Sequence, residues 1–210
     1  MKKLNWTKYR VHAVTSAELL AKTDFFARAA ELAATGCVAI NLRAHGLSGS
    51  KIYETALRLR EMTRRVGAFL VVNDRIDVAL AAGADGVHLG ARSIPLARAV
   101  ELCRSRGLGV GYSCHDLGQA EAAARAGADY LYLGTVFHSA GKPGTVPCGT
   151  AILAEVCRGV PVPVFGIGGI DPGNIRQIAE AGASGAAVIT AAWEALDFVG
   201  NVRLMGAAFD

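Results

Sequence analysis

The residues of this chain that could do chemistry stand directly after short apolar segments. They are Arg43, His45, Asn73, Asp74, His115, Thr135, His138, Ser139, Lys142 and Thr190. Asn, Asp and Ser form turns readily, so a purely structural role explains some of them. Arg43, His45, His115, His138 and Lys142 are not turn formers, and their recurrence at such points favours a site for an anionic small molecule.

A glycine-rich loop is the clearest local motif, and it reads Gly166-Ile167-Gly168-Gly169-Ile170. Asp171 fits the N-cap of a following helix, and Pro172 fits its first position. Glycines let backbone N–H groups approach a phosphate closely, and a helix N-terminus attracts its negative charge. We therefore predict a phosphate site at Gly168 and Gly169, with the Thr190 hydroxyl beside it. The alternative is that these glycines serve only a tight turn.

Three segments of the chain are copies of one another, and they show what must position these residues. They are 82–90 (AGADGVHLG), 126–134 (AGADYLYLG) and 181–189 (AGASGAAVI). Each copy is typical of a helix end, a glycine that stops the helix, and a short apolar strand. Repeated helix–glycine–strand units predict a parallel sheet with right-handed crossovers, whose ligands bind at the carboxyl ends of the strands.

Counting such segments along the chain gives eight expected strands. They are 10–14, 37–42, 68–72, 86–89, 108–112, 130–133, 162–167 and 186–189. Helical patterns lie between them, including 17–34, 51–66, 96–106 and 117–126. This alternation predicts an α/β fold, a (β/α)8 TIM barrel, with residues 1–210 as a single domain. A doubly wound open sheet is the alternative.

Composition excludes several classes of protein. Hydrophobic residues make up 52% of the chain, and the net charge is +4 with scattered basic residues, so no nucleic-acid partner is expected. No apolar run approaches the roughly 18 residues that span a membrane, and the N-terminus does not resemble a signal peptide. We therefore expect a cytoplasmic protein without a membrane partner. The five cysteines show no CxxC spacing and are expected to be free thiols, and a homo-oligomer remains open.

The chain resembles the thiamine-phosphate synthase/TenI superfamily over residues 10–192. Segments 72–80 (VNDRIDVAL) and 83–90 (GADGVHLG) are close to its signature. So are Gly134-Thr135-Val136-Phe137 and the glycine-rich loop. The resemblance implies a barrel that binds a small phosphorylated heterocycle.

Synthases of this superfamily join a pyrimidine diphosphate to a thiazole phosphate, with magnesium holding the pyrophosphate. Where their pattern has Arg-Glu-Lys, this chain has Arg43-Ala44-His45, and Ser93 stands in place of their second metal-binding aspartate. Ser139 and Gly141 replace two threonines before Lys142. Asp74 is then the single candidate ligand, so Mg²⁺ is expected only if the protein is a synthase. Asp74 also fits the N-cap of the next helix.

The TenI branch, whose activity is thiazole tautomerisation, resembles the synthases but lacks the same aspartate. Our main prediction is a metal-independent tautomerase without a cofactor, in which His138 or His115 moves the proton. The catalytic histidine of that branch falls at Thr135. Lys142, Gly168, Gly169 and Thr190 would hold phosphate and Arg43 a carboxylate, with His45, Asn73, Thr135 and Ser139 also contacting the substrate. The alternatives are a thiamine-phosphate synthase with altered metal ligands and a non-catalytic, regulatory ligand-binding barrel.

Overall fold

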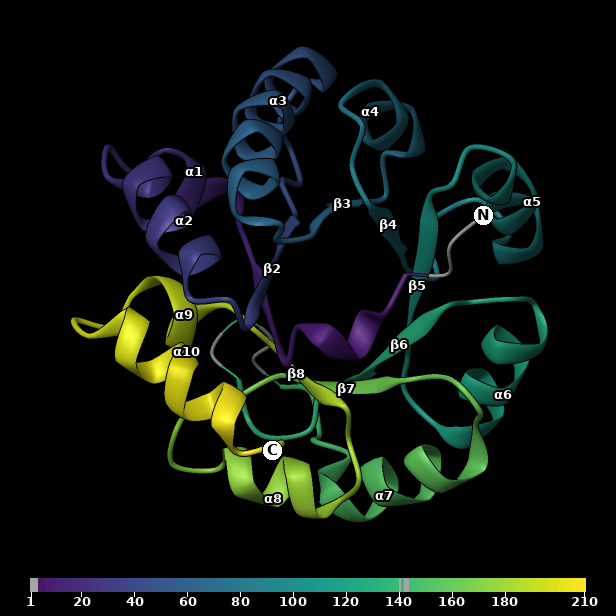
Figure 1. Ribbon diagram of the computed structural model, residues 1–210. Helices are drawn as coiled ribbons and strands as arrows, with labels where there is room; N and C mark the ends of the chain where they lie inside the picture. Colours follow the sequence, from purple (N-terminus) through teal and green to yellow (C-terminus); the bar gives the residue numbers. More distant parts are fainter. Residues whose placement is uncertain (1–3, 140, 142–143) are drawn as a thin grey trace.

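Eight parallel strands close into one barrel in the computed structural model, which describes residues 4–139, 141 and 144–210 (Figure 1). In chain order the strands are β1 Val11–Val14, β2 Val38–Leu42, β3 Leu70–Asn73, β4 Gly86–Leu89, β5 Gly109–Cys114, β6 Tyr130–Gly134, β7 Val164–Ile167 and β8 Gly185–Val188. Each strand pairs with the next, and β1 closes the barrel by pairing Val11 with Val38 of β2 and Ala186 of β8. The predicted (β/α)8 barrel is confirmed.

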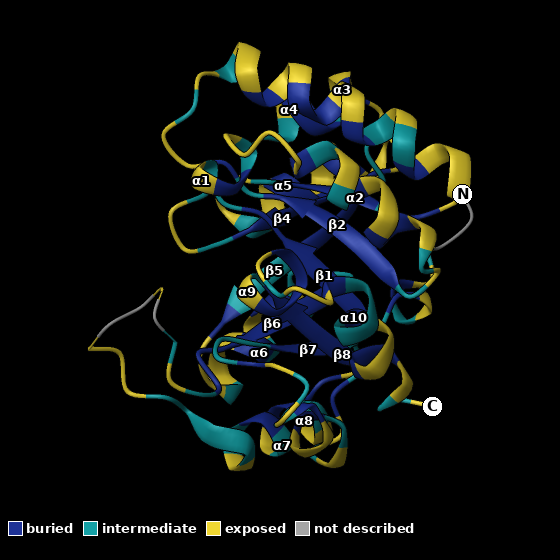
Figure 2. Ribbon diagram, turned by 90° about the vertical axis from the view of Figure 1, so that its left-hand side faces the viewer, coloured by how far each residue is buried: buried dark blue, intermediate teal, exposed yellow. Residues whose placement is uncertain are grey.

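Helices cover the outside of the barrel, with their exposed faces turned to solvent and the strands buried beneath them (Figure 2). They are η1 Trp6–Lys8, α1 Ala17–Leu20, α2 Phe25–Ala34, α3 Gly49–Val66, α4 Ile76–Ala81, α5 Leu96–Arg104, α6 Leu117–Arg125, α7 Gly149–Gly159, α8 Ile175–Glu180, α9 Thr190–Trp193 and α10 Phe198–Ala207. Among the described residues, no helix is both long enough and apolar enough to cross a membrane.

The three copied segments fold as the sequence predicts. Gly83, Gly127 and Gly182 have φ of +63°, +98° and +85°, the left-handed conformation that ends a helix. In the first copy the N–H of Ala84 donates to the carbonyl of Ala79, and the other two copies repeat this bond. In each of the three copies the turn therefore leads directly into the following strand, β4, β6 or β8.

The short helix η1, drawn in purple, lies across the centre of the barrel in Figure 1. Its Trp6 is buried and closes the amino-terminal face of the barrel. Gly86 and Gly109 begin β4 and β5, and a Cβ atom at either would lie 2.6 or 2.3 Å from the Trp6 ring. Both positions require glycine, because the indole ring fills the space that a side chain would occupy. The open end of the barrel is therefore the carboxyl end of the strands.

One predicted helix, 17–34, is two helices in the structure. Helix α1 ends at Leu20, and α2 begins at Phe25 after a turn through Thr23 and Asp24. Thr and Asp side chains compete with helical backbone hydrogen bonds, which explains the break.

Candidate functional site

A cavity of about 1070 Å³ opens at the carboxyl ends of the strands. The predicted site residues in its wall are Arg43, Asn73, His115, Thr135, His138, Ser139, Gly168, Gly169 and Thr190. Asp74 and His45 lie beside Arg43, just outside this wall. Lys142 falls outside the described residues. The topology therefore brings together side chains that are far apart in the sequence.

The loops after β6 and β7 form one end of the cavity. Phe137 donates its backbone N–H to the carbonyl of Gly168, so the two loops are held side by side. A Cβ atom on Gly169 would lie 2.2 Å from the carbonyl oxygen of His138, and φ there is +66°. Both the conformation and the close contact require glycine at this position, as the tight-turn interpretation predicts.

The helix after this loop begins later than the sequence predicts. Helix α8 starts at Ile175 and its N-cap is Asn174, not Asp171. The Asp171 carboxylate instead accepts the backbone N–H of Gly173, while the Asn174 amide donates to the carbonyl of Gly169. Side-chain bonds to nearby backbone therefore fold the segment as a turn before the helix.

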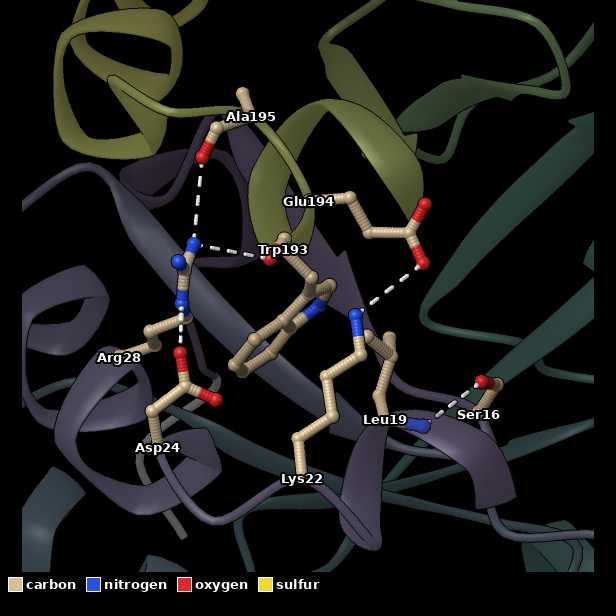
Figure 3. A network of polar contacts seen from close by, with 8 residues as sticks. All are labelled: Ser16, Leu19, Lys22, Asp24, Arg28, Trp193, Glu194 and Ala195. Carbon is tan, nitrogen blue, oxygen red and sulfur yellow. Dashed lines mark hydrogen bonds and ion pairs between the residues drawn. The ribbon is translucent and has the colours of Figure 1, made fainter.

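Helix α9, which begins at Thr190 in the cavity wall, is fixed at its other end by Arg28 of α2 (Figure 3). The Arg28 guanidinium donates to the carbonyls of Trp193 and Ala195 at 3.2 and 3.3 Å and pairs with Asp24 at 2.6 Å. A cation that satisfies the last carbonyls of a helix stabilises its carboxyl end. Arg28 is thus a positioning residue for the helix that carries Thr190.

Replacing Arg28 by methionine should lower the free energy of unfolding by about 1–2 kcal/mol, because two carbonyls lose a charged donor. For a chain of this size the melting temperature should fall by about 2–6 °C. Arg28→Lys keeps the charge but not the forked geometry and should recover less than half of the loss. Urea unfolding of the three proteins measures this, and an unchanged midpoint for Arg28→Met would contradict the role.

Asp74 follows β3 with a φ of +61°, a conformation that non-glycine residues seldom adopt. Its Oδ1 accepts the Ser93 hydroxyl at 2.6 Å, and its Oδ2 accepts the Asn73 amide at 2.7 Å. Helix α4 has Arg75 at its N-cap position, so the N-cap interpretation of Asp74 is wrong. The carboxylate instead joins the loop after β3 to the loop after β4.

Arg43 reaches the cavity from the end of β2. Its backbone N–H and carbonyl both bond to the Thr15 hydroxyl, at 2.9 and 2.8 Å, which ties the loop to β1. Burial lowers the pKa of the guanidinium, the Asp74 carboxylate opposes that shift, and the charge of Arg92 adds to it. Arg43 nevertheless stays a cation near neutral pH, and its half-buried position strengthens its attraction for an anion.

The floor of the cavity is a layer of polar side chains inside the barrel. The Tyr132 hydroxyl lies 2.6 Å from His12 Nδ1 and accepts the Asn41 amide at 3.2 Å. His88 bonds to the Ser113 hydroxyl at 2.9 Å and stacks on the Tyr132 ring. Burial lowers the pKa of both His12 and His88 to about 3, so neither is charged at neutral pH.

Two atoms of this floor have no partner among the described residues. They are Asn41 Oδ1 and His12 Nε2, and both side chains are buried. Asn41 lines the cavity, and its amide oxygen is a buried acceptor without a partner. Sequence reasoning missed the Tyr132 hydroxyl, although alternation along β6 places Tyr130 and Tyr132 on the inner face.

The remaining candidate histidines lie at the mouth of the cavity. His115 is bonded through Nδ1 to the carbonyl of Gly134, so that nitrogen carries the proton. His138 is exposed on the loop after β6. His88 is buried and also lines the cavity.

The fold and the site together define a (β/α)8 barrel with a polar cavity at the carboxyl ends of its strands. Residues 11–192 match the family described as thiamine monophosphate synthase. The chain therefore belongs to this family.

Individual relatives agree with the family. The chain is 38% identical over 200 residues to a thiamine-phosphate synthase of Chloroflexus aurantiacus, covering 95% of this chain and 92% of the relative. It is 44% identical over 163 residues to a thiamine biosynthesis bifunctional protein ThiM/ThiE of Symbiobacterium thermophilum, covering 77% of this chain but 34% of that longer protein. A solved thiamine phosphate pyrophosphorylase from Pyrococcus furiosus is 32% identical, with a TM-score of 0.86 and 98% of each chain covered.

The prediction of a thiazole tautomerase is wrong. The relatives that match most of the chain are thiamine-phosphate synthases, and so is the enzyme from Coprothermobacter proteolyticus, 40% identical over 172 residues. That prediction rested on departures from the synthase pattern at a few loop residues, Ala44, His45 and Ser93. The barrel as a whole, including the segments around the glycine-rich loop and Asp74, is similar to the synthases.

Proposed function

We propose that this chain is a transferase that joins a pyrimidine diphosphate to a thiazole phosphate, giving thiamine phosphate and pyrophosphate. The observation that supports the proposal is a single cavity whose two ends are lined by different polar groups. The glycine-rich loop and Thr190 lie at one end, and Arg43 and Asn73 lie at the other. A volume of about 1070 Å³ is at the upper limit for one small ligand and suits two heterocycles side by side.

The loop end holds the thiazole phosphate. Gly168 and Gly169 let this loop pack closely against the loop after β6, and both line the cavity together with Thr190. In the proposal, the phosphate accepts hydrogen bonds from the loop backbone and from the Thr190 hydroxyl. Ser139 and Lys142, on the loop after β6, complete this end in the proposal. Arg28 holds the carboxyl end of helix α9 and so keeps Thr190, at the start of that helix, in place.

The Arg43 end holds the diphosphate. The guanidinium can donate two parallel hydrogen bonds to phosphate oxygens, and the Asn73 amide adds a neutral donor. His45 lies on the same side of the site. The pyrimidine ring then rests over the floor, where the free Asn41 oxygen accepts a hydrogen bond from the ring.

The reaction forms a bond between the two rings while the bond from the pyrimidine's carbon to the diphosphate oxygen breaks. It requires alignment of the rings and stabilisation of the charge on the leaving diphosphate, rather than proton transfer. The neutral histidines of the floor suit this chemistry, because they hydrogen-bond without adding charge next to the reacting rings.

A crossed pair of variants tests the two ends separately. Thr190→Asp should weaken thiazole phosphate binding by about 10-fold or more through charge repulsion, and leave inorganic pyrophosphate binding within about 2-fold. Arg43→Met should do the reverse. Isothermal titration calorimetry with each ligand measures both effects, with Thr190→Val as the neutral control. If both variants weaken both ligands equally, the two-ended site is wrong.

A further inference from the structure

The family resemblance implies a magnesium ion at the diphosphate end, and the residues of this chain do not fit one. The two carboxylates near Arg43 among the described residues are Asp74 and Glu18. Both oxygens of Asp74 already accept hydrogen bonds, from Ser93 and Asn73. Mg²⁺ requires near-octahedral oxygen ligands and is usually held by one or two carboxylates. Across the described ranges, no group of three or more His, Cys, Asp or Glu side chains could hold a metal ion.

Two arginines lie at this end of the site, Arg43 in the cavity wall and Arg92 exposed just outside it. Arg43 lines the cavity, and Arg92 lies close enough for its positive charge to act on both Arg43 and His45. Within the part of the chain that the structure describes, neither Arg43 nor Arg92 forms an ion pair. Arg43 and Arg92 oppose the negative charge of Asp74 and Glu18 at this end, so a divalent cation gains little there, while a polyanion is attracted to the two guanidinium groups.

Asp74 has a structural task in this arrangement. Ser93 also accepts the backbone N–H of Gly90, at 3.0 Å, and thereby braces the loop that carries Arg92. The bond from Ser93 to Asp74 then fixes this loop against the end of β3. Asp74 is thus a positioning residue for Arg92.

We propose that Arg92 and Arg43 neutralise the diphosphate directly, so that this chain binds pyrophosphate without a divalent cation. The proposal rests on the proposed function, because it assigns the chemistry of that site's diphosphate end. It differs from the metal-dependent arrangement that the family resemblance implies. It also explains why Arg92 and Ser93 occur together in place of a carboxylate.

Calorimetric titration of the full chain with inorganic pyrophosphate, in EDTA and in magnesium, tests the proposal. Binding in EDTA should be within about 3-fold of binding in magnesium. Arg92→Gln should weaken binding in EDTA by about 10-fold, because one charge-assisted contact is lost, and Arg92→Lys should recover part of it. Arg98→Gln, which removes an exposed arginine on α5, is the matched charge control and should change binding less than 2-fold.

Binding that occurs only in magnesium, or an Arg92→Gln protein that binds as the wild type does in EDTA, would overturn the proposal. Product formation measured in the same two buffers separates this outcome from failure of the proposed function. Thiamine phosphate formed only in magnesium would leave the transferase standing and refute the metal-free site. Binding of pyrophosphate in EDTA without any product would confirm the metal-free site and refute the transferase.

Discussion

The free energy of unfolding should fall steeply as the pH is lowered from about 6.5 toward 3. His12 and His88 have a folded-state pKa of about 3, whereas unfolded histidine titrates near 6.5. Between these values the unfolded chain binds protons that the folded chain excludes, so acid favours unfolding. Stability is therefore fully present above pH 6.5 and is lost on acidification. Each histidine should contribute roughly 1.4 kcal/mol per pH unit, or nearly 3 for the pair.

Urea unfolding between pH 6 and pH 5 measures this slope. The lowered pKa values of the Asp24 and Asp77 carboxyls also make stability fall in acid. Their effect begins below about pH 5, outside this window. His12→Gln and His88→Gln should each remove about half of the slope, whatever they do to stability at pH 7. A flat pH dependence in the wild type would show that these histidines are not held neutral.

Arg43→Met should lower kcat/KM for thiamine phosphate formation by about 10²- to 10³-fold. The guanidinium is half-buried in the cavity wall and faces the end where the diphosphate would leave. Removing one preorganised charge from a developing anion typically has an effect of this size. Because the contact strengthens as the bond breaks, kcat should fall more than the affinity for the substrate.

Steady-state assays of pyrophosphate release measure the effect. Arg43→Lys keeps a cation but loses the planar fork, so it should retain an intermediate rate. Circular dichroism and thermal melting serve as the control for folding, since the Thr15 bonds to this residue involve only backbone atoms of position 43. A loss below about 5-fold for Arg43→Met would contradict its placement on the leaving group.

The sequence predicts the barrel and the end at which the cavity opens. Helix–glycine–strand copies are local patterns, and Gly83, Gly127 and Gly182 adopt the conformation that those patterns require. Residues that follow strands, such as Arg43 and Thr190, must then meet at one mouth. Local sequence was sufficient to predict these features because the connections of such a barrel are short and repeat the same geometry.

The sequence did not predict the polar floor or the state of Asp74. The Tyr132 hydroxyl meets His12 and Asn41 only after the barrel closes, across separations of 120 and 91 residues. The side chain of Asp74 fits an N-cap on local grounds, yet it turns away from α4 because Ser93 competes for it from the next loop. Both features depend on contacts between segments that are distant in the sequence, which local patterns do not predict.

The activity also could not be predicted from single loop residues. Ser93 and His45 differ from the synthase pattern and favoured a tautomerase, whereas the chain over residues 11–192 matches the synthase family. A substituted site residue removes one ligand, but it leaves the cavity in place.

The most direct measurement is product formation from both substrates. The purified chain is incubated with a pyrimidine diphosphate and a thiazole phosphate, and mass spectrometry follows both substrates and thiamine phosphate. Thiamine phosphate and pyrophosphate should form in a one-to-one ratio, with Arg43→Met slowed by about 10²- to 10³-fold. If both substrates bind but remain unjoined, the chain is a ligand-binding barrel and the central claim fails.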